Sequence, residues 1–263
     1  MPFTPAHIAA VLPFRRSRLV WSALVVGAMA PDFEYFLRMS PQDRYGHTFP
    51  GVFLFTLPLG LLTLWIFHAY VKTQFVELMP DAMSRRLAPI AGKFRFGGAS
   101  RFALILASLL VGIGTHIVWD SFTHGNTRLT RHWAVLRHPA HVPRIGFVPL
   151  YKLLQHSSTV MGLAIVFVWL VARRHTVKDG PEYLPRLEAV APGTWPLRRI
   201  LILASMATIA TLGAILRASM SIGIPSNHTR LALFIGDVAA TMIALMWWQF
   251  VALGIWRSRK WAG

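Results

Sequence analysis

Cysteine is absent from the 263 residues of this sequence. Its absence excludes a disulfide scaffold, a thiolate nucleophile and thiolate metal ligands, so any catalytic or metal chemistry must come from histidine, carboxylate and hydroxyl side chains. Charged residues are also scarce, at 14% of the chain, against about a quarter of an average soluble domain. Because 54% of the residues are hydrophobic, too few polar side chains remain to cover a soluble core. The composition excludes an ordinary cytosolic enzyme and a disordered chain, and it predicts a polytopic membrane protein.

Acidic residues are the scarcer charged type, with 10 Asp and Glu against 27 Lys and Arg, and the net charge is +17. In a soluble domain such an excess would suggest nucleic-acid binding, but no nucleic-acid-binding motif accompanies it here. The basic residues instead form short runs at the ends of apolar segments: Arg15-Arg16, Arg85-Arg86, Arg173-Arg174, Arg198-Arg199 and residues 257–260. This pattern is typical of anchoring to anionic lipid headgroups. We expect membrane lipids, and no nucleic acid, as partners.

Five apolar stretches predict membrane-spanning helices. They are residues 51–71, 102–120, 157–172, 200–216 and 233–256, which approach or exceed the length of about 20 residues that a span needs. A sixth apolar run, residues 19–30, is too short to cross alone and predicts a re-entrant or interfacial helix, or a core helix packed on the bundle. Thr4-Pro5 predicts the start of a short N-terminal helix. We therefore expect an all-α, polytopic membrane helix bundle.

We expect a single integral membrane domain over residues 1–263. Its parts would be a site-forming N-terminal region (1–50), the first three spans with the loop of the site (51–172), a polar linker (173–198) and the last two spans (199–263). The linker contains Pro181, Pro185, Pro192 and Pro196, which favour a connector over a folded domain.

The number of crossings determines which loops share a side of the membrane. The N-terminal region and the loops 121–156 and 217–232 would lie on one side. The loops 72–101 and 173–199 and the C-terminus would lie on the other, which carries more Lys and Arg close to the span ends. The positive-inside rule makes this second side cytoplasmic, so the first side would face outward.

The end of the second predicted span carries a pattern of metal-binding side chains. His116, Asp120 and His124 follow one another at intervals of four residues, so they would share one face if the helix continues. Three such ligands suit Zn²⁺ or a similar divalent ion. The alternative is that His116 and Asp120 pair with each other or with water, because a histidine and a carboxylate at membrane depth are costly unless partnered.

Further candidate ligands fall on the same predicted side of the membrane as Asp120: His7, Asp32, His47 and His156. A divalent metal lowers the pKa of its bound water from about 15.7 to about 7, which would give a hydroxide nucleophile next to the lipid headgroups. We predict catalytic roles for Asp120 and for Glu34, which could act as a general base or hold a ligand histidine. Arg128 and Arg131 could bind a phosphate, although such residues are more often interfacial anchors.

Two other features bear on the packing of the spans. Gly112 and Gly114 directly precede His116 and indicate close helix packing. Asp237 is a carboxylate inside the fifth predicted span, for which the sequence names no partner.

Four motifs in order carry a resemblance to a known family: Thr4-Pro5-Ala6-His7, Gly27-Ala28-Met29-Ala30-Pro31-Asp32, Gly46-His47-Thr48, and Thr115-His116 followed by Asp120 and His124. Together they resemble the bacterial membrane family labelled domain of unknown function 4184, which is related to membrane-bound, metal-dependent hydrolases. Their order also resembles that in the helical zinc-dependent phospholipases C.

The resemblance implies ligands for a divalent metal, with zinc favoured, at His7, Asp32, His47, His116 and Asp120, and it extends the candidate set to His124 and His156. It also implies a multi-pass protein of the bacterial inner membrane, whose site would face outward in the topology above. The His-x-x-x-Glu motif of the phospholipases is missing, because Val160 follows His156 at that spacing.

The leading hypothesis is an integral membrane, metal-dependent hydrolase. Its substrate would be a phosphoester or another ester at the lipid interface, with an anionic or phosphate-bearing group as one option, attacked by a metal-bound hydroxide. One alternative is a transporter or an ion or proton pathway through His116, Asp120 and Asp237. Another is a structural membrane protein with a non-catalytic His/Asp cluster. The span centres at residues 57–67 and 201–212 are almost wholly apolar, which disfavours a pathway.

Overall fold

The protein is described by a computed structural model that covers residues 3–42, 44–87, 94–144, 146–172 and 197–260. Its contacts divide the chain into two compact units. The first unit comprises Met1–Phe33, Arg44–Leu64 and Phe96–Arg173, and the second comprises Glu34–Asp43, Trp65–Arg95 and Arg174–Gly263. We describe each unit by itself, and the expectation of a single domain stays a prediction.

The fold is almost entirely helical, as predicted, and five helices are long and apolar enough to cross a membrane. These helices are Phe49–Leu78, Ala99–His132, Leu150–Ala172, Leu197–Ile222 and Thr229–Arg259. Each predicted span lies within one of them, but the helices are longer. The third helix begins at Leu150 and not at Ser157, because its first two turns carry polar side chains that a search for apolar runs leaves out.

The first unit begins with a series of short helices. They are η1 (Thr4–His7), α1 (Ile8–Val11), η2 (Leu12–Arg16), α2 (Trp21–Met29) and η3 (Ala30–Asp32). The chain then enters α3 (Phe33–Arg38), which lies mostly in the second unit. The short apolar run at residues 19–30 is α2, and its buried side chains make it a core helix of the first unit.

The first spanning helix is continuous but changes its winding along its length. It consists of α4 (Phe49–Gly51), the π-helical η4 (Val52–Thr56), α5 (Leu57–Ile66), the π-helical η5 (Phe67–Val71) and α6 (Lys72–Leu78). The boundary between the two units falls between Leu64 and Trp65, within α5.

The rest of the first unit follows from residue 99. It comprises α8 (Ala99–Thr123), α9 (Arg128–His132), α10 (Ala134–Arg137), β1 (Pro139–Val142), β2 (Gly146–Pro149) and α11 (Leu150–Ala172). The antiparallel hairpin of β1 and β2 pairs Val142 with Gly146. The sequence prediction treated this hairpin as part of a loop.

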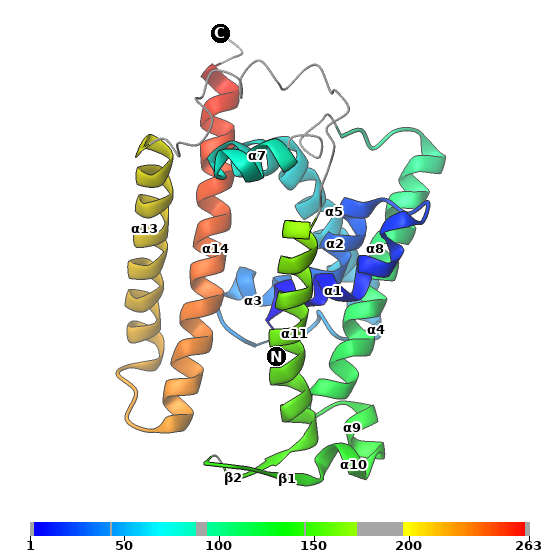
Figure 1. Ribbon diagram of the computed structural model, residues 1–263, viewed down its shortest axis with the longest axis vertical. Helices are drawn as coiled ribbons and strands as arrows, with labels where there is room; N and C mark the ends of the chain where they lie inside the picture. The colour runs from blue at the N-terminus through cyan, green and yellow to red at the C-terminus, as the bar shows by residue number, and fades with distance from the viewer. Residues whose placement is uncertain (1–2, 43, 88–93, 145, 173–196, 261–263) are drawn as a thin grey trace. The chain divides into compact units, whose positions relative to one another are not determined.

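The second unit contains α7 (Asp81–Leu87), α13 (Leu197–Ile222) and α14 (His228–Lys260). Helices α13 and α14 lie side by side (Figure 1) and pack with α6 and η5 around buried apolar side chains. The buried residues of this core are Val71, Leu78, Met206, Phe250 and Val251.

Asp237 on α14 has a partner in the neighbouring helix. Arg217 of α13 donates a hydrogen bond to the Asp237 carboxylate, and the Ser221 hydroxyl donates to the same oxygen at 3.2 Å. The second guanidinium nitrogen of Arg217 donates to the carbonyl oxygen of Arg38 at 3.2 Å. The intramembrane carboxylate is therefore ion-paired, which is the arrangement that makes a buried charge tolerable in a span.

Close packing of α2 on α8 depends on two glycines. A Cβ atom on Gly27 would lie 2.3 Å from the carbonyl oxygen of Leu109, and a Cβ on Gly112 would lie 2.4 Å from that of Leu24. Both contacts are with backbone, which cannot move aside, so only glycine fits. Gly114 has open space around its Cα. The prediction of close packing is therefore confirmed for Gly112 and wrong for Gly114.

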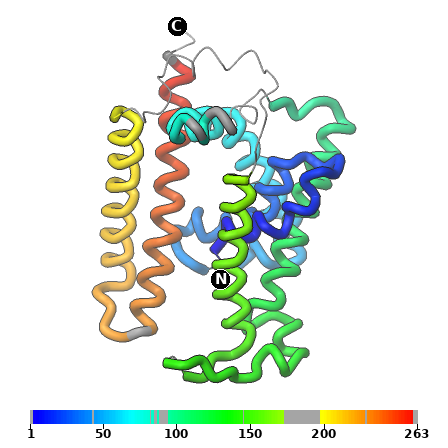
Figure 2. The backbone as a smooth tube through the Cα atoms, viewed as in Figure 1, coloured from blue at the N-terminus to red at the C-terminus, as the bar shows by residue number. Residues whose placement is uncertain are grey.

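Residues 3–32 fold back on themselves as a structure that we call the N-terminal hairpin (Figure 2). On the outward path, the Phe3 amide donates to Thr159 Oγ1 at 3.1 Å, and farther along Arg15 and Arg16 lie beside Trp169, near the C-terminal end of α11. On the return path, the Val20 amide donates to Ser108 Oγ at 2.9 Å, and α2 then packs along α8.

This path differs from the expected topology. The sequence prediction placed the whole N-terminal region at the end of the spans that carries the loop 121–156. The hairpin instead brings Arg15 and Arg16 to the opposite end of α11. The reason is that α1 is apolar and packs along α11 within the first unit.

Candidate metal centre

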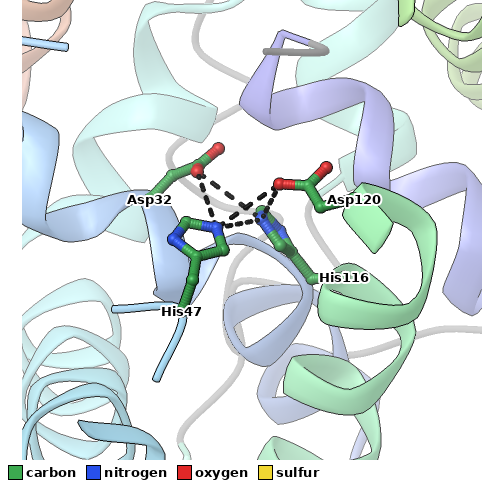
Figure 3. Close-up of side chains that lie close together, drawn as sticks. All are labelled: Asp32, His47, His116 and Asp120. Atoms are coloured by element: carbon green, nitrogen blue, oxygen red, sulfur yellow. Dashed lines mark hydrogen bonds and ion pairs between the residues drawn. The ribbon is translucent and has the colours of Figure 1, made fainter. Parts of the chain in front are cut away.

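Four side chains from separate parts of the first unit converge at one point. Asp32, His47, His116 and Asp120 each offer a ligand atom, and these atoms all lie within 4.8 Å of one another. Figure 3 shows the four side chains directed toward one another. Asp32 ends η3, His47 lies in the turn before α4, and His116 and Asp120 lie one turn apart on α8. The structure thus brings together four of the predicted ligands.

The distances within this group fit a single cation. His116 Nε2 lies 3.3 Å from Asp120 Oδ2 and 3.5 Å from Asp32 Oδ1. His47 Nε2 lies 3.3 Å from His116 Nε2, 3.4 Å from Asp120 Oδ2 and 3.8 Å from Asp32 Oδ1. Tetrahedral coordination at metal–ligand distances of about 2.0–2.1 Å separates neighbouring ligand atoms by about 3.3–3.4 Å. Five of the six spacings, at 3.3–3.8 Å, are close to these edges, and the sixth, between Asp32 and Asp120, is within 4.8 Å.

The backbone of α2 fixes the orientation of His116. This fully buried imidazole has its Nδ1 atom 2.7 Å from the carbonyl oxygen of Ala28. A carbonyl oxygen only accepts, so Nδ1 carries a proton and Nε2 is the ring nitrogen that faces the group. This is the second-sphere hydrogen bond that metal-bound histidines commonly make. It depends on the close approach of α2 to α8 at Gly27 and Gly112.

A hydroxyl group fixes the orientation of Asp32. Thr4 Oγ1 donates to Asp32 Oδ2 at 2.6 Å, and both residues are buried. Asp32 Oδ1 is buried without a hydrogen-bond partner among the described residues and lies toward the two imidazoles. One oxygen is thus held by the protein while the other is presented to the group.

His47 sits in a turn that hydrogen bonds hold at both sides. The buried Thr56 hydroxyl donates to the carbonyl oxygen of Gly46 at 3.1 Å. Thr48 caps the start of the first spanning helix, because its side chain accepts from the Gly51 amide at 3.1 Å. The motif Gly46-His47-Thr48 therefore places the imidazole on a fixed turn.

His7 contacts the group without belonging to the four. It is buried, its ring stacks on His116 at a centroid distance of 3.8 Å, and its Nε2 lies 3.4 Å from Asp120 Oδ1. Burial lowers the pKa of His7 to about 4. The imidazole is therefore neutral at physiological pH, which is the form that binds metals.

His124 and His156 lie outside the four-residue group. Helix α8 ends at Thr123, so His124 leaves the predicted helical stripe. Its Nδ1 lies 3.1 Å from the Asp120 carbonyl oxygen and 3.6 Å from Asp120 Oδ2. His156 is exposed on α11. For both residues the ligand role stays a prediction.

The other predicted polar groups have partners or are exposed. Glu34 belongs to the second unit and is buried, with its carboxylate accepting from Arg38 Nε at 2.8 Å. Arg128 and Arg131 are exposed on α9, and Arg131 Nε donates to the Thr127 carbonyl oxygen at 3.3 Å. The catalytic role of Glu34 and a phosphate contact at Arg128 and Arg131 stay predictions.

Sequence reasoning did not identify Thr4 or the Ala28 carbonyl as parts of the centre. Thr4 had a visible signal, since it opens the helix that carries His7, but its hydroxyl was assigned only to that helix start. The carbonyl of Ala28 leaves no signal in a sequence, because every residue has one. The sequence offered only an indirect indication, since Gly112 predicted close helix packing near His116 without naming the partner helix.

Comparison with known proteins identifies the family but not a characterised relative. No curated protein and no solved structure matches the chain. The model of one family, described as "Domain of unknown function (DUF4184)", matches residues 1–255. The match covers nearly the whole sequence and includes all four ligands of the candidate centre. The chain, whose described residues include five helices long and apolar enough to cross a membrane, therefore belongs to this family of unknown function.

Proposed function

We propose that the protein is an integral membrane hydrolase that binds Zn²⁺ through Asp32, His47, His116 and Asp120. Its substrate would be a phosphoester or another ester at the lipid interface. The observation that carries this proposal is the convergence of two imidazole nitrogens and two carboxylates within 4.8 Å from three separate segments of the chain.

Unsatisfied polar atoms around the group support a bound cation. Asp32 Oδ1, Asp120 Oδ1 and both ring nitrogens of His7 are buried without hydrogen-bond partners among the described residues. Each such atom costs about 1–3 kcal/mol when it stays unpaired. A cation near these atoms would offset part of that cost, whereas an isolated network of ion pairs leaves it in place.

The donor set indicates which metals fit. Nitrogen and oxygen ligands without sulfur suit Zn²⁺, and the spacing of the ligand atoms suits its tetrahedral geometry. A zinc ion bound there would supply Lewis acidity and lower the pKa of a nearby water to about 7. Asp120 would hold one oxygen toward the metal and the other toward the neutral His7, which would help to fix the orientation of the carboxylate.

The position of the centre along α8 supports an interfacial substrate. His116 lies seven residues before the end of α8, which is about 10 Å along the axis. Asp120 lies only three residues before that end, so the centre would lie between the middle of α8 and one of its ends. For the transporter alternative, Asp237 is already ion-paired with Arg217, so it offers no free carboxylate for a relay.

Metal content in purified protein tests the binding step. We expect about one zinc per chain in the wild type and less than about a tenth of that in His116→Ala, because His116 Nε2 faces all three other ligands. His138→Ala is the matched control, since His138 is exposed and outside the group, and it should retain the wild-type content. Negligible metal in all three proteins would show that the proposed metal centre does not exist.

Hydrolysis needs a separate test. The zinc-loaded protein should cleave a chromogenic phosphodiester or carboxylic ester, and Asp120→Asn should reduce the rate at least a hundredfold. A comparison of lipids between a deletion strain and its parent would then identify the natural substrate. Metal binding without cleavage of any ester would favour the structural role of the His/Asp cluster.

A further inference from the structure

An open groove of about 720 Å³ lies between the N-terminal hairpin and α11. Its walls are apolar over most of their length: Leu12 and Pro13 come from the hairpin, and Ala164, Ile165, Val168 and Trp169 come from α11. Ile165 is 46% exposed and Val168 is 61% exposed, so this surface is open to the hydrocarbon of a bilayer. The groove belongs wholly to the first unit and is separate from the metal centre.

The charged side chains that line the groove, among the residues that the structure describes, are all positive. They are Arg15 and Arg16, and both are exposed. Among the residues that the structure describes, no ion pair involves either arginine. Arginines of the second unit differ in this respect, because Arg199, Arg217 and Arg257 each pair with a carboxylate. An anionic partner from outside the chain would complement the two guanidinium groups.

The groove lies near the end of a span. Trp169 is three residues before Ala172, the last residue of α11 that the structure describes, and Arg173-Arg174 follow in the sequence. Its ring lies beside that of Trp21, with a centroid distance of 5.5 Å. Paired tryptophans near a helix end are typical of the level of the lipid headgroups. The arginines would therefore meet headgroups while the apolar wall meets acyl chains.

We propose that this groove is a binding site for an anionic glycerophospholipid. The lipid phosphate would lie against Arg15 and Arg16, and one acyl chain would lie along Ile165 and Val168 of α11. A zwitterionic lipid offers the same chains without the net negative charge, and a free phosphate offers the charge without the chains. A bound lipid would join the hairpin to α11 and so stabilise the segment that carries Thr4 and His7.

Thermal unfolding of the full-length protein in neutral detergent tests this proposal. Phosphatidylglycerol should raise the Tm of the wild type by about 5–10 °C at a concentration about 100-fold above its Kd, and phosphatidylcholine should raise it far less. The double variant Arg15→Gln/Arg16→Gln should bind phosphatidylglycerol about 10- to 30-fold more weakly. The control Arg137→Gln/Arg230→Gln removes the same charge from two exposed arginines elsewhere and should respond like the wild type.

A second pair of variants tests the apolar wall without changing charge. Ala164→Trp fills the groove and should reduce the response to phosphatidylglycerol. Val160→Trp, on an exposed position of α11 outside the groove, should leave it unchanged. An equal response to both lipids, a wild-type response in the Arg15/Arg16 variant, or the full shift with inorganic phosphate alone would each overturn the proposal.

Discussion

The Thr4 hydroxyl holds one oxygen of the Asp32 carboxylate, so that the other faces the candidate metal centre. Thr4→Val keeps the shape of the side chain but removes this hydrogen bond, and we expect it to weaken zinc binding about 10- to 100-fold. Thr4→Ser keeps the hydroxyl and should retain affinity close to that of the wild type. Zinc titration of the metal-free proteins measures the difference. Equal affinities for the valine and serine variants would show that Thr4 has no part in positioning Asp32.

The sequence predicted which residues could be metal ligands, but it did not predict all of the groups that hydrogen-bond to those ligands. His116 and Asp120 form a local pattern that any helix would place on one face. Asp32 and His47 were predicted only through resemblance and the expected side of the membrane, because long-range convergence depends on the path of the chain. The hydrogen bond to the Ala28 carbonyl could not be predicted, since backbone groups carry no residue-specific signal.

At the scale of the elements, the contact between α2 and α8 determines whether His116 can reach its backbone partner. Gly112→Ala would place a Cβ atom 2.4 Å from the Leu24 carbonyl oxygen. We expect the helices to separate, with a loss of about 2–4 kcal/mol in stability and a loss of bound zinc. Gly114→Ala lies on the same helix with open space around it, so it should retain both. Thermal unfolding and elemental analysis of the two variants distinguish them, and similar behaviour of both would argue against the close packing.

The ion pair between α13 and α14 makes a second prediction at this scale. Asp237→Leu leaves Arg217 without its carboxylate inside the span, and we expect a cost of about 3 kcal/mol. The double variant Arg217→Leu/Asp237→Leu removes both charges and should recover much of that loss. Unfolding in detergent gives the free energies of the wild type, Asp237→Leu, Arg217→Leu and the double variant. If the loss in the double variant equals the sum of the losses in the two single variants, the charges do not interact.

Hydropathy predicts the spans because lipid-facing side chains must be apolar whatever the helix packs against. Hydropathy does not predict the hairpin of β1 and β2. Its eight strand residues include two prolines, a glycine and a histidine, so they form no continuous apolar run. Hydropathy also does not predict the direction in which the N-terminal hairpin runs. Helices α1 and α2 are too short to span, so their hydropathy does not indicate which end of the bundle they approach.

At the scale of the whole molecule, the N-terminal hairpin changes the distribution of charge between the ends of the spans. Arg15 and Arg16 lie beside the C-terminal end of α11, which is the end that the sequence prediction assigned to the cytoplasm. Their charge adds to that of Lys and Arg already counted there, so the positive-inside bias becomes larger. The His116 end of α8 would then face outward, because α8 and α11 are successive spans that run in opposite directions.

Reporter fusions test this orientation. A fluorescent protein fused to the C-terminus should fluoresce in the cytoplasm, and alkaline phosphatase inserted between β1 and β2 should be active outside. Because orientation follows the balance of basic residues, Arg15→Gln/Arg16→Gln should lower the fraction of molecules with this topology, while Arg137→Gln/Arg230→Gln should not. An active phosphatase at the C-terminus would reverse the assignment and place the metal centre on the cytoplasmic side, where its substrate would have to be a lipid or ester of the inner leaflet.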